Sequence, residues 1–113
     1  MSAIESQPPH VRVALDEFKR RLTARWPRDL VAVCLFGSRA RGEANSWSDV
    51  DVAVVLERAG FREKKDAIDI ASDVGLEHDL LISPTVFDRA TYERWRRQER
   101  PLVMDIEREG VPL

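Results

Sequence analysis

The sequence has 113 residues, the size of one domain, and its 43% apolar and 34% charged residues exclude a disordered chain. Eighteen Lys and Arg residues against twenty Asp and Glu residues give a formal charge of −2, which excludes a duplex-binding domain that works by positive charge alone. A single cysteine excludes an internal disulfide, and no apolar stretch approaches the length of a membrane span, so we expect one cytoplasmic domain over residues 1–113, with residues 1–8 frayed and without direct nucleic-acid binding.

The first part of the chain predicts a helix and then a buried strand. Apolar residues recur at spacings of three and four from His10 to Trp26, which is typical of an amphipathic helix, and Pro27 ends it. The apolar run over residues 30–36 is short and rich in β-branched residues, so it predicts a buried strand. A short helical turn and a loop follow, over residues 38–43 and 45–48.

Strands and helices alternate in the rest of the chain. The predicted elements are a strand over residues 49–56, a helix over 62–74, a strand over 78–86 and helices over 88–97 and 102–109. Gly75 is the expected stop of the first of these helices, and Pro84 places its strand at a sheet edge or a bulge. This order predicts an α/β fold, with a small mixed sheet and helices packed on it.

The most informative stretch runs from Gly37 to Asp51 and joins the first two predicted strands. Gly37 and Ser38 open a helical turn, whose N–H groups and hydroxyl can bind phosphate oxygens. Arg39 and Arg41 can add positive charge beside them. We therefore expect a phosphate-binding site at Gly37, Ser38, Arg39 and Arg41.

Asp49 and Asp51 are two residues apart on a predicted strand, so their carboxylates point the same way. A cation relieves the repulsion between two such charges, and Mg²⁺ usually takes one or two carboxylates together with substrate phosphates. Asp79 lies directly before the apolar run of the third predicted strand and can join the pair if that strand lies beside the second. Glu77 has the same facing and stays the alternative third acid. Three carboxylates beside a phosphate site predict two Mg²⁺ ions, which Mn²⁺ can replace, and in-line phosphoryl or nucleotidyl transfer.

Gly37-Ser38, ten further residues and then Asp49-x-Asp51 resemble the signature of nucleotidyltransferases of the DNA polymerase beta superfamily. The short chain and its closing IEREGVPL are similar to the minimal nucleotidyltransferase group. The resemblance implies that Gly37 and Ser38 bind the triphosphate and that Asp49 and Asp51 hold both metal ions. It also implies that Asp79 holds the catalytic ion and helps to activate the incoming hydroxyl.

The same resemblance implies a reaction and a partner. The larger relatives carry a further helical domain for the acceptor, and the minimal group is known from toxin–antitoxin pairs with HEPN-domain proteins. We expect an antitoxin that transfers AMP from ATP to a tyrosine of a HEPN toxin, in a hetero-oligomer with it. The alternatives are an antitoxin that works by contact alone and a nucleotidyltransferase for a small, aminoglycoside-like acceptor.

Two further features stay open at this level. Trp47, in the loop before Asp49, can stack on a base or cover the core. The cluster of Arg94, Arg96, Arg97 and Arg100 around Trp95 forms either a solvated helix face, with Trp95 packed inward, or a partner surface.

Overall fold

The computed structural model describes residues 4–45 and 49–113. Its elements in chain order are α1 (Pro9–Arg25), β1 (Leu30–Phe36), β2 (Val50–Leu56), α2 (Phe61–His78), β3 (Ile82–Asp88), α3 (Arg89–Arg97), α4 (Pro101–Glu109) and β4 (Val111–Pro112). The strands form one sheet in the order β3-β2-β1-β4. Because β1 runs antiparallel to β2 and β4 while β2 and β3 are parallel, the sheet is mixed, as the sequence predicted.

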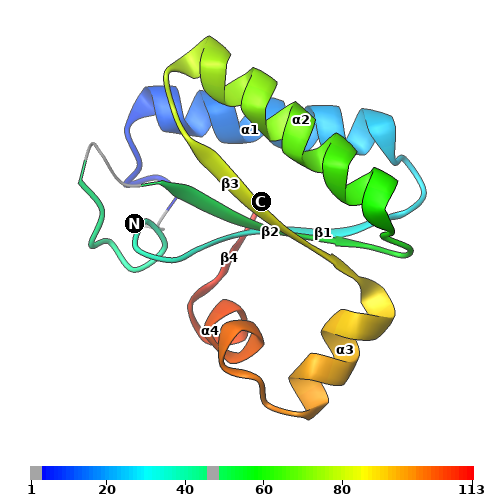
Figure 1. The fold of residues 1–113 in the computed structure, drawn as a ribbon. Coiled ribbons are helices and arrows are strands. Elements are labelled where there is room, and N and C mark those ends of the chain that lie inside the picture. Colours follow the sequence, from blue (N-terminus) through cyan, green and yellow to red (C-terminus); the bar gives the residue numbers. More distant parts are fainter. Residues whose placement is uncertain (1–3, 46–48) are drawn as a thin grey trace.

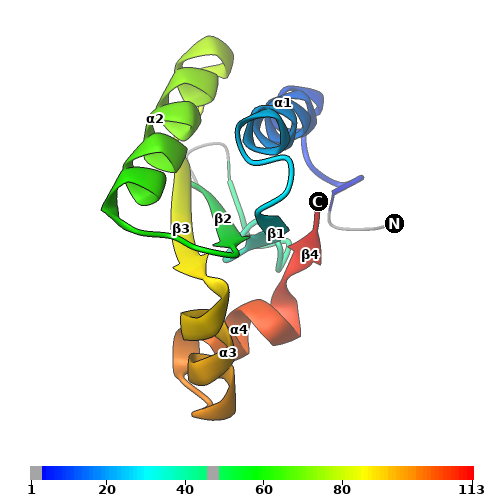
Figure 2. The ribbon, with the colours of Figure 1, turned by 90° about the vertical axis from the view of Figure 1, so that its right-hand side faces the viewer.

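The sheet lies between two layers of helices, with α1 and α2 on one face and α3 and α4 on the other (Figures 1 and 2). Val50, Val52 and Val54 of β2 face α1 and α2 in the larger apolar cluster. Ala53 and Val55 belong to a smaller cluster that includes residues of α4. Since side chains alternate along a strand, the odd-numbered positions of β2 lie on the α3/α4 face.

The N-terminal segment is packed rather than frayed from Ile4 onward. Ile4 lies against the larger apolar cluster, and Gln7 is only 7% exposed. Gln7 donates from its Nε2 to the carbonyl oxygen of Arg39 over 3.0 Å. The expectation of a frayed start is therefore wrong for residues 4–8, where Gln7 contacts a residue 32 positions away; residues 1–3 lie outside the described part of the chain.

The predicted end of the second helix at Gly75 is wrong. Helix α2 continues to His78, and Asp79 forms its C-cap in the left-handed region, with φ 55° and ψ 48°. Gly75 is buried inside the helix, where a Cβ would lie 2.5 Å from the carbonyl oxygen of Leu80. This glycine allows close packing against the returning chain, and the sharp reversal at Asp79 ends the helix.

Strand β3 is an edge strand, which confirms the interpretation of Pro84. The carbonyl of Leu81 accepts a hydrogen bond from the N–H of Val50, so the backbone groups of alternate residues from Leu81 onward point toward β2. The nitrogen of Pro84 consequently lies on the outer edge, where its missing N–H removes no bond to β2. The other outer strand, the two-residue β4, was not predicted; it pairs with Cys34 and Leu35 of β1.

None of the helices in the described ranges has the length and apolar character that crossing a membrane requires.

Candidate functional site

Asp49 and Asp51 lie at the start of β2 on the face of the sheet that carries α3 and α4. Asp51 pairs in register with Phe36 of β1 and with Ser83 of β3, and Asp49 directly precedes the strand. Asp49 is exposed and Asp51 is half-buried. Burial raises the pKa of the Asp51 carboxyl above its usual value, and the charge of Asp49 raises it further. The predicted carboxylate pair is therefore present, and the two charges repel each other.

Gly37 packs directly against this pair. Its backbone has a φ of +75°, and a Cβ on it would lie 2.4 Å from Oδ2 of Asp51 and 3.2 Å from the carboxyl carbon. Such a distance is far shorter than van der Waals contact, so any side chain at position 37 would displace the Asp51 carboxylate. The sequence predicted that this glycine lets the backbone approach a ligand; in the structure it lets the backbone approach Asp51.

The turn that follows Gly37 is helical, as predicted. The N–H of Arg41 donates to the carbonyl of Gly37 over 3.2 Å, and that of Glu43 donates to the carbonyl of Ser38 over 2.9 Å. The first N–H groups of a helical turn have no partner within it, so they can bind an anion. Ser38 is half-buried at this position, next to the glycine that contacts Asp51.

Arg41 places a positive charge near Asp51. Its charge opposes the upward shift in the pKa of Asp51. Its guanidinium also forms ion pairs with Glu43, at 3.0 Å, and with Glu109 at the end of α4, at 3.1 Å. These contacts tie the turn to the C-terminal helix across 68 positions of sequence. The role of Glu109 was missed because no local pattern links residues so far apart.

Arg39 occupies a different environment from Arg41. It is only 4% exposed, and its Nη1 lies 3.3 Å from Oε1 of Gln7. A cavity of about 420 Å³ adjoins it; its lining is formed by Ser6, Gln7, Pro8, His10, Arg39, Gly42, Ala44 and Asn45. This lining includes neither Asp49 nor Asp51, so the cavity is distinct from the carboxylate pair. The guanidinium of Arg39 anchors the N-terminal segment to the turn.

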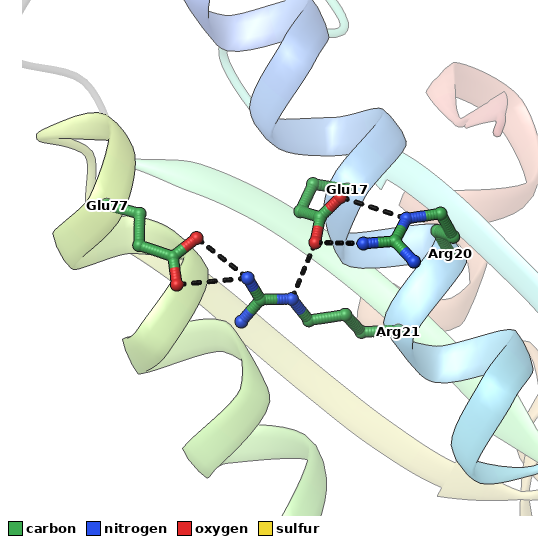
Figure 3. A network of polar contacts seen from close by, with 4 residues as sticks. All are labelled: Glu17, Arg20, Arg21 and Glu77. Carbon is green, nitrogen blue, oxygen red and sulfur yellow. Dashed lines mark hydrogen bonds and ion pairs between the residues drawn. The ribbon is translucent and has the colours of Figure 1, made fainter.

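The predicted third acid does not lie on a strand. Asp79 is the C-cap of α2, and β3 begins three residues later. The alternative, Glu77, lies within α2, where both of its carboxylate oxygens bind Nη2 of Arg21, at 3.0 and 2.7 Å (Figure 3). The reasoning from a shared strand face was therefore wrong for both residues. In the described ranges, no three His, Cys, Asp or Glu side chains come close enough to hold a metal ion.

The lone cysteine and one of the two tryptophans left open by the sequence can now be placed. Cys34 is half-buried, and burial raises the pKa of its thiol. Trp95 packs edge-on against Phe87, with ring centroids 5.8 Å apart, and the guanidinium of Arg100 lies 4.8 Å from its ring. This contact favours the interpretation of Trp95 as a packed residue. Trp47 lies outside the described residues.

The residues at the start of β2 fit a divalent cation. Two carboxylates on one face provide hard oxygen ligands, and a cation between them relieves the repulsion that adds to the effect of burial on the pKa of Asp51. The adjoining turn offers N–H groups to an anion. The arrangement suits the phosphates of a nucleotide and the cation that accompanies them.

Comparisons with known proteins give a consistent assignment. The model of the family described as "Nucleotidyltransferase domain" matches residues 15–109. Two proteins of Methanocaldococcus jannaschii, each named "Putative protein adenylyltransferase", are 40% identical over 76 residues and 35% identical over 78 residues. Each match covers 66% of this chain; the first spans 77% of the relative and the second 52% of it.

A solved structure shares the fold. The crystal structure described as a "putative nucleotidyltransferase from Sulfolobus solfataricus" superposes with a TM-score of 0.58 at 23% sequence identity. The superposition covers 99% of this chain and 86% of the other.

Proposed function

Because this chain belongs to the nucleotidyltransferase domain family, we propose that it transfers AMP from ATP to a hydroxyl group of another protein. The names of the two Methanocaldococcus proteins support a protein acceptor. The resemblance in the signature residues further suggests a tyrosine of a HEPN-domain toxin as the acceptor, with this chain as the antitoxin in a hetero-oligomer.

In this reaction the acceptor oxygen forms a bond to the α-phosphorus of ATP. The bond from that phosphorus to the oxygen bridging to the β-phosphate breaks, pyrophosphate leaves, and the hydroxyl proton passes to a base. Catalysis of such a displacement depends on positioning and on charge. We assign the triphosphate to the turn that begins at Gly37, where the Ser38 hydroxyl and the first N–H groups can donate hydrogen bonds.

Asp49 and Asp51 are the proposed ligands of the Mg²⁺ that accompanies ATP, and Mn²⁺ can replace it. When bound, the cation neutralises phosphate charge and orients the triphosphate. Gly37 allows the Asp51 carboxylate to take this position, because it has no Cβ that would clash with Oδ2. Arg41 supplies positive charge beside the pair, whereas Arg39 is proposed to keep the turn in shape through Gln7.

The contact between Gly37 and the Asp51 carboxylate is the observation that carries this proposal. It joins the phosphate-binding turn and the metal-binding strand into one site, although the two residues are fourteen positions apart. A pair of aspartates in a surface loop has no such constraint. If Gly37 served only to end β1, the space beside its Cα would not need to be filled by a carboxylate.

The direct test uses this protein and a purified HEPN-domain protein as the acceptor. The two are incubated with Mg²⁺ and ATP, and the HEPN protein is examined by mass spectrometry. We expect the addition of AMP to a tyrosine with wild-type protein and none with Asp51→Asn. Asp73→Asn is the matched control, because Asp73 is exposed on α2, outside the site, and this variant should transfer AMP as the wild type does.

Protection of cells from the toxin separates this proposal from the contact-only alternative. Asp51→Asn should abolish protection while binding of the HEPN protein persists. If that variant binds normally and still protects fully, the protein works by contact and the enzymatic proposal is wrong. Transfer of AMP to an aminoglycoside, without transfer to any protein, would favour the small-molecule alternative.

A further inference from the structure

The sheet face around Asp49 and Asp51 is defined by the register of three strands. Asp51 has Phe36 on one side and Ser83 on the other. Paired residues of neighbouring strands point to the same face, so both neighbours share the face of the carboxylate. Neither side chain is an acid.

The position beside Asp49 is occupied by Leu81. The Leu81 carbonyl accepts from the N–H of Val50 over 2.9 Å, which continues the parallel register by one residue before β3 begins. Leu80 and Ile82 both pack into the cluster beneath α1 and α2. Leu81, between them, therefore points to the opposite face, and it is 64% exposed.

A third carboxylate would have to stand on this face of β3 to share cations with the pair. The strand offers a leucine and a serine there, and the acid before it, Asp79, lies in the turn that caps α2. Within the described ranges no group of three ligating side chains forms. Residues 1–3 and 46–48, which lie outside those ranges, are Met, Ser, Ala and Trp, so they include no His, Cys, Asp or Glu.

From this arrangement we infer that the carboxylate pair holds a single divalent cation, and that Leu81 stands where a third carboxylate would complete a two-ion site. The inference rests on the proposed binding of a nucleotide with its cation, and it replaces the expectation of two ions. Two ions about 3.5–4 Å apart need bridging and flanking carboxylates to offset their mutual repulsion. Asp49 and Asp51 are sufficient for one ion that also binds phosphate oxygens.

The test counts Mn²⁺ ions on the full chain with a non-hydrolysable ATP analogue, α,β-methylene-ATP, equimolar with protein. Equilibrium dialysis gives the number of Mn²⁺ ions bound per chain, from which the number bound by Asp51→Asn is subtracted as background. Electron paramagnetic resonance reports whether the bound ions are magnetically coupled. We expect one ion per chain and an uncoupled six-line spectrum for the wild type. Leu81→Asp should bind two ions and give a coupled, broadened spectrum.

Leu76→Asp is the matched control, because Leu76 is 83% exposed on α2 but does not lie on the sheet. It should bind one ion, as the wild type does. Ser83→Asp repeats the test beside Asp51 in case Leu81→Asp does not fold. Two coupled ions on the wild type would overturn the inference. So would folded Leu81→Asp and Ser83→Asp variants that both fail to gain an ion. Either result would leave the proposed function intact. No Mn²⁺ on the wild-type complex would overturn both.

Discussion

Gly37 has two constraints that can be separated by experiment. The residue has a positive φ, which any L side chain adopts at a cost, and it also leaves room for the Asp51 carboxylate. Gly42 has nearly the same φ, +74°, but a Cβ there would meet no atom of the described residues within 4 Å. The two glycines of one turn thus share the backbone constraint, and only the first touches the proposed metal ligand.

Replacing each glycine by alanine should therefore give different functional results. Gly37→Ala and Gly42→Ala should each lose about 1–2 kcal/mol of stability from the left-handed backbone. Only Gly37→Ala should also lose binding of Mn²⁺ with the ATP analogue, since its Cβ displaces Asp51. Thermal melts and Mn²⁺ dialysis on both variants check this. Equal loss of Mn²⁺ binding in the two would contradict the role given to the contact.

The carboxylate of Asp51 opposes folding when no cation is present. Its pKa in the folded chain is raised above 3.8, first by burial and then by Asp49. A carboxyl with a raised pKa binds protons more readily in the folded state. Its destabilising effect is therefore absent below pH 3.8 and develops as the pH rises through the raised pKa.

Asp51→Asn should accordingly melt at a higher temperature than the wild type at pH 7 without divalent ions. The difference should narrow as the pH falls toward 3.8, because the wild-type carboxyl then becomes neutral. Circular dichroism melts across this range, with Asp73→Asn as the surface control, measure the effect. A variant less stable than the wild type at pH 7 would mean that Asp51 makes favourable contacts that outweigh its repulsion and burial.

At the scale of elements, the sequence predicted β1, α1 and most of β2 because their residues carry strong local signals. The apolar run of β1 and the periodicity of α1 are local signals, and both elements ended within one residue of their predicted bounds. The run overstated the burial of β1, because Val31 and Ala32 are exposed. The turn after Gly37 and the Asp49–Asp51 pair followed from the same local chemistry. These are the parts of the site that lie close together in sequence.

The end of α2 and the position of Asp79 could not be predicted in this way. Gly75 carries the usual signal for a helix end, but its place inside α2 follows from packing against Leu80, a tertiary contact. An aspartate in the left-handed region then ends the helix where a glycine would be expected. Because the predicted strand began four residues too early, the facing assigned to Asp79 and Glu77 was wrong as well.

Helices α1 and α2 are joined by an ion-pair network with Arg21 at its centre (Figure 3). Arg21 binds both oxygens of Glu77 through Nη2, and its Nε lies 2.7 Å from Oε1 of Glu17. Arg20, which binds the same Glu17, stays within α1 and is more exposed. The network therefore crosses between the helices only through Arg21.

Arg21→Ala should lower the melting temperature more than Arg20→Ala, because only the first change removes an ion pair between α1 and α2, while the second such pair, Arg25 with Asp66, is left intact in both variants. High salt should shrink the difference, since exposed ion pairs are screened. Melts of both variants at low and high salt measure it. Equal losses, or a difference that salt leaves untouched, would indicate that the network acts by packing and not by charge.

For the whole molecule, the two helical layers are unequal. Helix α1 buries Val11, Ala14, Leu15, Phe18 and Leu22 against the sheet, whereas α3 has no buried residue and α4 has two. Burial of apolar surface supplies most of the free energy that keeps an element in place. The layer of α3 and α4 should therefore open first.

Hydrogen exchange followed by mass spectrometry tests this difference. Amides of residues 89–109 should exchange faster than amides of α1 and α2, because the openings that expose them cost less free energy. Arg41→Ala should accelerate the exchange of α4 further, since it removes the ion pair with Glu109. Equal protection of the two layers would show that the molecule opens only as a unit.

Pro84 also bears on how this protein resists strand addition between copies of itself. The outer edge of a sheet can template the strand of a second molecule through its unpaired donors and acceptors, which is the first step of amyloid-like assembly. Pro84 removes a donor near the middle of the outer edge of β3. On the opposite side, β4 pairs only with Cys34 and Leu35, and Val31 of β1 stays exposed. Strand addition between molecules is thus blocked at β3, and the earlier residues of β1 are the place where aggregation would begin.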